Sequence, residues 1–281
     1  MRLTLDHDAA LNCLPDRDPW GHKGDFGKIL LLCGSRGYTG APALAAMAAL
    51  RSGAGLVYLA VPESIYAIEA GKLLEPVVIP LPDRDGRLHA SGLPRILELL
   101  PKMDAVLIGP GLGQSEEVER VVTTVLQQAS CPVVVDADGI NVLQTHRDVL
   151  RDRTSTTILT PHDGEFRRLG GAIGEDRAES AEALARELDL IVVLKGHRTV
   201  ITDGIVTFEN RTGNPGMAVG GSGDVLAGMV VSFLGQGIPP LKAAAAAAWF
   251  HGAAGDLCAG EMGQYGMLPS DMLAVLPRLL K

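Results

Sequence analysis

The sequence is most informative at Gly213-Asn214-Pro215-Gly216-Met217-Ala218-Val219-Gly220-Gly221-Ser222-Gly223-Asp224, which runs directly into the apolar segment Val225 to Leu234. Five of these twelve residues are glycine, so few side chains can pack and the backbone itself is the working surface. A glycine-rich turn that opens a helix points several N–H groups and the positive helix end at one place, which suits a phosphate group. We therefore expect an anion-binding turn at the start of a helix.

Asp224 is an unusual residue for such a turn, because its carboxylate repels a bound anion. The cost is understandable if Asp224 accepts the proton of a hydroxyl group that then attacks a phosphoryl group. For a lone Gly-x-Gly-Asp, helix capping by Ser222 or Asp224 would be the more frequent explanation. The length of the glycine run favours phosphoryl transfer here, with Asp224 as the catalytic base.

The size and composition of the chain favour an α/β protein. Its 281 residues suffice for one large domain or two small ones. Hydrophobic residues make up 47% and aromatic residues only 4%, which is typical of parallel sheets covered by helices. The net charge of -8 argues against nucleic acid or an anionic membrane as a partner, so an anionic substrate needs a local site.

The cysteines and the terminal residues predict a cytoplasmic location. The four cysteines form no Cys-x-x-Cys pair and lie far apart in the sequence, at Cys13, Cys33, Cys131 and Cys258. This pattern is typical of reduced thiols. The acidic N-terminal segment is too polar for a signal peptide. The longest apolar stretch, Ala243 to Ala254, is too short to span a bilayer and predicts a buried helix.

Short apolar runs alternate with helical patterns along most of the chain. The predicted strands are Lys28 to Cys33, Leu56 to Val61, Val77 to Leu81, Ala105 to Ile108, Val133 to Val135, Thr157 to Leu159 and Ile191 to Leu194. The predicted helices between them include Ala41 to Arg51, Leu93 to Leu100, Glu116 to Gln128 and Ala178 to Leu188. This alternation predicts a mainly parallel sheet with helices on both faces.

The pattern changes near Thr199. Thr199 to Thr202, a turn at Asp203-Gly204 and Ile205 to Glu209 predict a β-hairpin. After the glycine-rich turn the remainder is predicted to be helical to Lys281. No repeat or linker divides the sequence, so we expect residues 1–281 to form one domain.

Polar or glycine-rich loops follow several predicted strands, at the sheet edge where α/β proteins bind ligands. They are Gly109 to Gly113, Asp136 to Asn141, Thr160 to Glu165 and Lys195 to Thr199. The Walker A, GxGxxG, HExxH and GxSxG patterns are absent from the sequence. His251 is expected to be a hydrogen-bonded core residue, and Lys195 either a rim residue or a contact for nucleotide phosphate.

These motifs together resemble the ribokinase-like ADP/ATP-dependent NAD(P)H-hydrate dehydratases, from about Trp20 to the C-terminus. The resemblance is carried by His22-Lys23-Gly24-Asp25-Phe26-Gly27-Lys28, Gly34-Ser35 with Tyr38-Thr39-Gly40-Ala41-Pro42, Gly109-Pro110-Gly111-Leu112-Gly113, Asp136-Ala137-Asp138-Gly139, Leu159-Thr160-Pro161-His162 with Gly164-Glu165, Leu194-Lys195-Gly196 and the glycine-rich turn. Val219 and Ser222 stand where threonine is common in that family. The resemblance implies a three-layer α/β/α fold without a separate lid domain. It also implies a stand-alone form that lacks the epimerase domain of the fused enzymes.

The resemblance further implies a function and a set of site residues. Such enzymes phosphorylate the ring hydroxyl of (S)-NADH or NADPH hydrate and eliminate phosphate, so that the reduced cofactor returns. With ADP the other product is AMP. By resemblance, Asp224 is the base, and the N–H groups of Gly221, Ser222 and Gly223 form the anion hole. Substrate-binding residues would be Ala41, Gly111, Gly113, His162 and Asp224; nucleotide-binding residues would be Lys195, Gly196, His197, Arg198, Thr199 and Gly223.

The same resemblance implies Mg²⁺ as cofactor, with Glu165 acting on it through water. His162 replaces an asparagine that related kinases use, so His162 is not expected to be a direct metal ligand. The sequence leaves open whether ADP or ATP is used, and whether NADH or NADPH hydrate is preferred. The alanine-rich helix indicates a homo-oligomer, with a tetramer as a candidate.

Two alternatives use the same glycine-rich turn. A vitamin or sugar kinase of the ribokinase-like class would release a phosphorylated product. A nucleotide-binding regulator would have no catalysis. The surroundings of Ala41 and His162 favour the dehydratase over the kinase, and the retention of Asp224 argues against a regulator.

Overall fold

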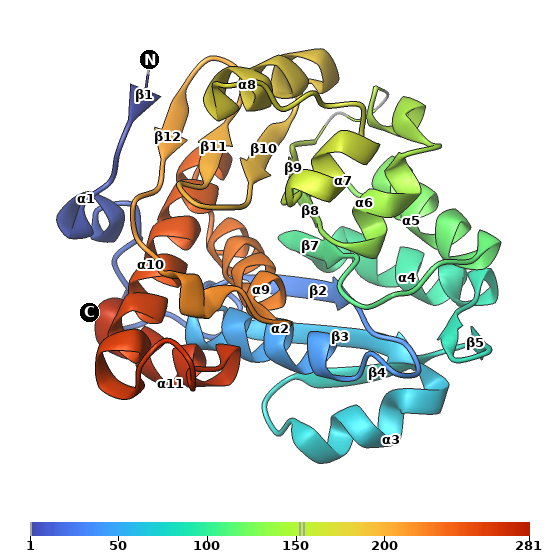
Figure 1. The fold of residues 1–281 in the computed structure, drawn as a ribbon. Helices are drawn as coiled ribbons and strands as arrows, with labels where there is room; N and C mark the ends of the chain where they lie inside the picture. The colour runs from blue at the N-terminus through green and yellow to red at the C-terminus, as the bar shows by residue number, and fades with distance from the viewer. Residues whose placement is uncertain (1, 152, 154) are drawn as a thin grey trace.

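The computed structural model describes residues 2–151, 153 and 155–281. Ten strands form one sheet in the order β1-β12-β11-β10-β9-β8-β7-β2-β3-β4 (Figure 1). The strands are β1 (Arg2–Leu3), β2 (Lys28–Leu32), β3 (Leu56–Pro62), β4 (Val77–Leu81), β7 (Ala105–Ile108), β8 (Val133–Val135), β9 (Thr157–Leu159), β10 (Ile191–Leu194), β11 (Val200–Thr202) and β12 (Thr207–Glu209). β11 is antiparallel to both its neighbours, and the other pairs are parallel. β5 (Asp83–Arg84) and β6 (Arg87–Leu88) form a separate small hairpin.

Helices cover both faces of this sheet. One face packs against α2 (Gly40–Arg51), α9 (Ser222–Gly235), α10 (Pro240–Met262) and α11 (Pro269–Leu279), and α1 (His7–Leu11) lies beside α10. The opposite core includes residues of α4 (Leu93–Leu99), α5 (Glu116–Gln128), α6 (Asp138–Leu143), α7 (Asp163–Arg168) and α8 (Arg177–Leu188). α3 (Glu63–Lys72) lies against β3 and β4. Short 3₁₀ turns are Ala90–Gly92, Leu100–Lys102, Arg147–Leu150 and Pro215–Met217. Neighbouring strand residues point to opposite faces, so Leu31 joins the first core and Leu30 the second.

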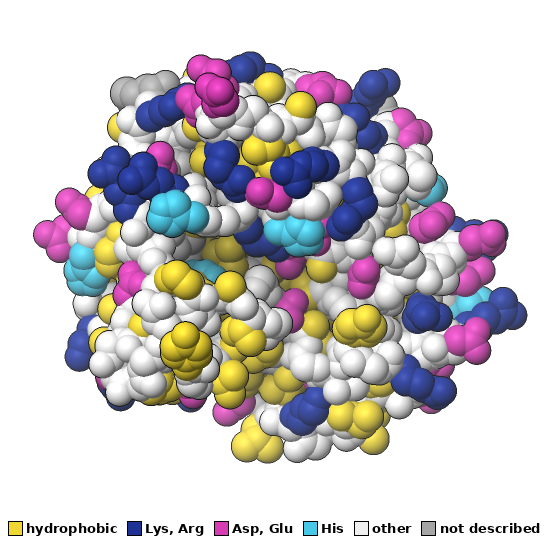
Figure 2. Space-filling view, viewed as in Figure 1, with side chains coloured by type: hydrophobic (Ala, Val, Ile, Leu, Met, Phe, Trp, Pro, Cys, Tyr) yellow, Lys and Arg dark blue, Asp and Glu magenta, His cyan; other side chains and the backbone are white. Residues whose placement is uncertain are grey.

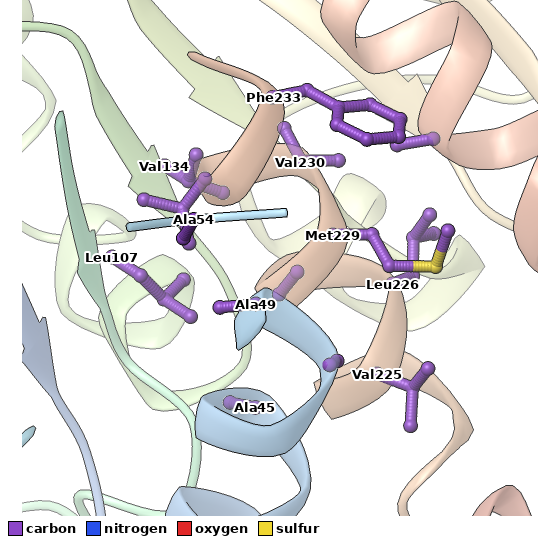
Figure 3. Packing of buried hydrophobic residues seen from close by; sticks show 14 of the residues in the cluster. Ala45, Ala49, Ala54, Leu107, Val134, Val225, Leu226, Met229, Val230 and Phe233 are labelled. Carbon is purple, nitrogen blue, oxygen red and sulfur yellow. The ribbon is translucent and has the colours of Figure 1, made fainter. Parts of the chain in front are cut away.

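Close contact between α2 and α9 fixes the helix that follows the glycine-rich turn. Figure 3 shows Val225, Met229 and Phe233 of α9 among the buried side chains of this core. A Cβ on Gly228 would lie 2.3 Å from Ala45 O, so only glycine allows this approach. Since α9 is buried along nearly its whole length, its N-terminus is held firmly against the sheet edge.

The structure confirms the predicted α/β/α class, and most predicted element bounds agree within one residue. The alanine-rich stretch lies within the long buried helix α10, as expected. The hairpin turn is longer than predicted, because β12 begins at Thr207 rather than Ile205. No helix among the described residues combines the length and apolar character needed to cross a bilayer.

Candidate active site

The loops after three neighbouring strands bring Asp136, Thr160 and Lys195 together. Asp136 follows β8, Thr160 follows β9 and Lys195 follows β10. The Lys195 Nζ atom lies 2.8 Å from Asp136 Oδ1, and Thr160 Oγ1 donates to the same oxygen at 2.7 Å. Burial lowers the pKa of Lys195, but the carboxylates of Asp136 and Glu165 outweigh this effect and hold that pKa above its usual value. The result is a charged pair at the carboxyl edge of the sheet.

Asp136 is held by backbone as well as by side chains. Its exposed fraction is only 1%, and a Cβ on Gly109 would lie 1.8 Å from its carbonyl oxygen. The following residue, Ala137, has a φ of 48°, a conformation that a residue with a Cβ seldom adopts. Asp138 accepts the Gly113 N–H at 2.8 Å and so links this loop to the loop after β7. The carboxylate of Asp136 therefore has little freedom to move.

Asp224 lies in the first turn of α9, above this pair. A Cβ on its neighbour Gly223 would lie 3.3 Å from Lys195 Nζ and 3.8 Å from Asp136 Oδ2. Burial, and then the charge of Asp136, raise the pKa of Asp224 to about 7, although Lys195 acts in the opposite direction. A carboxyl group with that pKa is suited to general-base catalysis near neutral pH.

The amide groups at the start of α9 are only partly free. Gly221 has a φ of 100° and makes the turn into the helix. Ser222 N donates to Val219 O at 3.3 Å, so one of the three predicted anion-hole amides already has an acceptor. Gly221 N and Gly223 N have no hydrogen-bond acceptor in the described part of the chain. These two amides are the better donors to an anion.

His251 of α10 holds the same turn through a hydrogen bond. Its Nε2 lies 2.9 Å from the carbonyl oxygen of Ser222. Burial lowers the pKa of His251 to about 4, so it is neutral at physiological pH and donates to that carbonyl. The expectation of a hydrogen-bonded core histidine is confirmed. The sequence did not reveal that its acceptor is the glycine-rich turn.

His162 and Glu165 form a capping box at the start of α7. Gly164 N donates to His162 Nδ1 at 2.9 Å, and His162 N donates to Glu165 Oε2 at 2.8 Å. The His162 side chain is 55% exposed, whereas the Glu165 side chain is only 6% exposed and lies 3.9 Å from Lys195 Nζ. His162 thus has a local structural role and still presents an accessible ring edge.

The predicted substrate residues Ala41 and Gly111 are adjacent. A Cβ on Gly111, whose φ is 65°, would lie 3.1 Å from Ala41 Cβ and 3.0 Å from Tyr38 Cβ. Ser35 Oγ donates to Gly111 O at 2.7 Å and fixes the two loops together. Gly113 lies at the far end of its loop, against the Arg87 side chain.

The predicted nucleotide segment makes a tight turn after β10. Thr199 Oγ1 donates to Gly196 O at 3.0 Å, and Arg198 has a φ of 57°. Arg198 Nη1 lies 3.6 Å from Glu209 Oε1, and His197 is exposed. The Arg198 side chain thus pairs with β12. Lys195, by contrast, lies close to the glycine-rich turn, because its Nζ atom would be 3.3 Å from a Cβ on Gly223. Figure 2 shows a hollow near the middle of this face, with histidine and basic side chains along part of its rim.

The acidic residues fit Mg²⁺ only as an ion that arrives with phosphate. Among the described residues, no group of three His, Cys, Asp or Glu side chains could hold a metal by itself. Glu165 Oε2 is already a hydrogen-bond acceptor within the capping box. Mg²⁺ is commonly held by one or two carboxylates together with waters and substrate phosphates. Asp136 and Glu165 can supply carboxylate oxygens in such a set.

Comparisons with known proteins show the family to which the chain belongs. The model of the NAD(P)H-hydrate dehydratase family matches residues 29–278. The chain belongs to this family. It is 46% identical over 275 residues to the bifunctional NAD(P)H-hydrate repair enzyme of Moorella thermoacetica, an alignment that covers 95% of the chain and 52% of that protein. The chain spans about half the length of the curated relatives it matches, which include that of Salinibacter ruber at 40% identity.

Solved structures share the fold of this chain. An ADP/ATP-dependent NAD(P)H-hydrate dehydratase from Bacillus subtilis, co-crystallised with ATP and Mg²⁺, is 34% identical with a TM-score of 0.82, and the match covers 98% of this chain and 96% of that one. A ribokinase-like protein from Enterococcus faecalis is 28% identical with a TM-score of 0.87, over 99% and 95% of the two chains. A Pyrococcus horikoshii hydroxyethylthiazole kinase, at 20% identity and a TM-score of 0.66, shares the fold.

Proposed function

We propose that the chain is an ADP- or ATP-dependent (S)-NAD(P)H-hydrate dehydratase, a hydro-lyase. The observation that carries this proposal is the Asp224 carboxyl group, with a pKa of about 7, beside free amides at the start of a buried helix in a chain of this family. The substrates would be hydrated NADH or NADPH and an adenine nucleotide. We further propose one domain over residues 1–281, a cytoplasmic location and a homo-oligomer, with a tetramer as the candidate form.

The chemistry explains why a dehydratase has the site of a kinase. Hydroxide leaves slowly near neutral pH, so direct loss of water from the hydrate is difficult. Asp224 would take the proton of the ring hydroxyl while its oxygen attacks the terminal phosphorus of the nucleotide. The ring nitrogen lone pair then expels phosphate, and loss of a proton from the neighbouring ring carbon restores the double bond. With ADP the products are NADH or NADPH, AMP, phosphate and a proton, so the atoms balance.

The other residues of the site would orient the reactants. The N–H groups of Gly221 and Gly223, with a contribution from Ser222, would stabilise the transferring phosphoryl group. Lys195, Gly196, His197, Arg198 and Thr199 would contact the nucleotide together with Gly223. Ala41, Gly111, Gly113 and His162 would line the hydrate site. Mg²⁺ would neutralise charge on the phosphates, with Glu165 acting through water.

The test is to incubate the protein with hydrated NADH, Mg²⁺ and either ADP or ATP. We expect the absorbance of NADH to return, with one phosphate released per NADH formed. The nucleotide product, AMP or ADP, identifies the preferred donor. A kinase of the ribokinase-like class would instead turn over nucleotide with a simple alcohol, and would release a phosphorylated product without restoring NADH. Nucleotide consumption that does not depend on the hydrate would overturn the dehydratase proposal.

A further inference from the structure

A second cavity lies at the opposite edge of the sheet from Asp224. Its volume is about 640 Å³, and it opens where β2 and β3 begin and beside α4. This volume is within the range of small-molecule sites, roughly 300–1,000 Å³. The His22 to Lys28 loop forms one wall, so this motif of the resemblance is not used by the candidate active site.

Four basic side chains and one carboxylate line this cavity, although the chain as a whole has a net charge of -8. Lys23 and Lys28 line it, and their side chains have no hydrogen-bond or ion-pair partner in the described part of the chain. Arg95 and Lys102 also line it and share one carboxylate, at 2.6 Å and 3.6 Å from Glu98. Two more carboxylates lie near the rim. Asp25 Oδ2 is 2.8 Å from His22 Nδ1, and Asp104 Oδ2 accepts the backbone N–H of Lys28 at 2.7 Å.

The loop that carries Lys23 and Lys28 is firmly seated. A Cβ on Gly55 would lie 1.9 Å from Lys23 O, and a Cβ on Gly27 would lie 2.5 Å from Gly235 O. Gly27 has a φ of 91°, which favours glycine there. Arg17 covers the ring of Phe26 from the other side, 4.0 Å from its centroid. The two unpaired lysines therefore lie on a loop whose backbone packs closely against the rest of the fold, which lowers the ordering cost of binding a ligand.

The remaining wall is apolar and includes an aromatic ring. The cavity is also lined by Leu56, Tyr58, Leu99 and Met103. Basic side chains can bind phosphate, and an apolar wall with an aromatic side chain can pack against a flat ring. The cavity therefore suits a molecule that carries both groups. From this geometry we propose a second ligand site for an organic phosphate with a ring, such as a nucleotide, at the amino edge of the sheet. This inference is independent of the proposed function.

The test is a count of bound ligand by equilibrium dialysis, with ADP, pyrophosphate and adenosine as probes. It compares the wild type with Lys23→Gln/Lys28→Gln and with Lys242→Gln/Lys281→Gln, a control that makes the same charge change outside the cavity. If the active site also binds ADP, we expect two ADP per chain in the wild type and the control, and one in the cavity variant. Affinity at the lost site should fall about tenfold or more. Circular dichroism would establish that each variant is folded.

The ring is tested separately with Tyr58→Leu. This change should weaken ADP at the cavity several-fold and leave pyrophosphate binding there unchanged, and adenosine should not bind there. If the proposed function fails and the active site binds no nucleotide, the wild type would bind one ADP and the Lys23→Gln/Lys28→Gln variant none, which still supports the cavity site. Identical ADP stoichiometry and affinity in the wild type and that variant would overturn it.

Discussion

At the carboxyl edge of the sheet, Asp136, Lys195 and Asp224 lie close together, and the charge of Asp136 helps to raise the pKa of Lys195 and that of Asp224, whereas at the amino edge Lys23 and Lys28 have no partner in the described chain. The carboxyl-edge pair is linked by a 2.8 Å contact between side chains that are 20% and 2% exposed. Lys23 at the amino edge is exposed. Charges at the first edge are thus coupled through a low-dielectric interior, and charges at the second are screened by water and salt.

The difference indicates that the carboxyl edge of the sheet is suited to catalysis, whereas the amino edge is suited to ligand binding alone. A proton acceptor near neutral pH needs a perturbed pKa, and such a perturbation requires burial and a nearby charge. Only the carboxyl edge supplies both. The amino edge instead supplies lysine side chains that have no partner in the described chain and can bind a ligand.

The largest effect is expected from Asp224→Asn. The substitution keeps the size of the side chain, so folding and ligand binding should survive, but the amide cannot accept the hydroxyl proton. General-base catalysis contributes on the order of 10² to 10⁴ in rate, so we expect kcat to fall by about that factor. Steady-state kinetics with separate binding of hydrate and nucleotide checks this. The N-cap of α9 is Gly221 and no side chain caps this helix, so the capping role considered for Ser222 or Asp224 is not seen. Near-wild-type turnover would mean that Asp224 is not the base.

The next effect concerns stability. Lys195→Ala leaves the Asp136 carboxylate buried without its partner, and breaking a buried pair in this way costs about 3–5 kcal/mol of unfolding free energy. Lys23→Ala at the amino edge is the matched control and should change the same free energy by less than about 0.5 kcal/mol. Urea unfolding measures both. Equal losses of unfolding free energy in the two variants would show that the buried pair contributes no more to stability than the exposed Lys23 does.

A double variant separates charge from packing at the same pair. Asp136→Asn with Lys195→Met removes both charges and should recover part of the stability lost in Lys195→Ala.

Where Lys195→Ala is folded, its nucleotide KM should rise more than its kcat falls, because the substitution removes a contact that binds the nucleotide in the ground state. An unchanged nucleotide KM would confine Lys195 to a structural role.

The fold could be predicted largely from the sequence, because runs such as Val133–Val135 and Ile191–Leu194 are buried strands with clear apolar character. The hairpin turn was misplaced for a local reason. Asp203 Oδ1 accepts the N–H groups of Ile205 and Val206 at 2.9 Å and 2.8 Å, which lengthens the turn beyond Asp203-Gly204. β1 was missed because Arg2–Leu3 becomes a strand only by pairing with β12, far along the chain.

The individual residues of the candidate site could be predicted from the sequence, but the ion pair between Asp136 and Lys195 could not. Asp136, Thr160 and Lys195 each directly follow an apolar run, which is a signal for the carboxyl edge. That β9 lies between β8 and β10, and so brings Asp136 to Lys195, depends on the strand order of the folded sheet. The sequence pattern therefore predicts Lys195 at the rim or on phosphate, and it does not predict the ion pair with Asp136. The contact of His251 with Ser222 O was missed for the same reason.

A smaller effect is expected on the pH dependence. The base must be deprotonated, so kcat/KM should rise with pH through the Asp224 pKa of about 7 in the wild type. Burial is the largest cause that raises this pKa, and the negative charge of Asp136 is the second. Asp136→Asn should therefore move the acid limb of kcat/KM to lower pH by about one unit, which corresponds to roughly 1.4 kcal/mol. An acid limb that stays near pH 7 would show that the two carboxyl groups are not coupled.

The smallest effect is expected from His162→Ala, which tests whether an exposed side chain at the carboxyl edge binds substrate or only caps α7. Loss of the cap should cost about 1 kcal/mol of unfolding free energy. If the accessible ring edge also meets the hydrate, the hydrate KM should rise several-fold while AMP binding is unchanged, because the nucleotide segment follows a different strand. His162→Asn separates the two roles, since asparagine keeps the cap but not the ring. If the folded His162→Asn protein binds the hydrate as well as the wild type does, His162 only caps α7. The reaction at the carboxyl edge would then depend on the buried groups around Asp224 and not on this exposed ring.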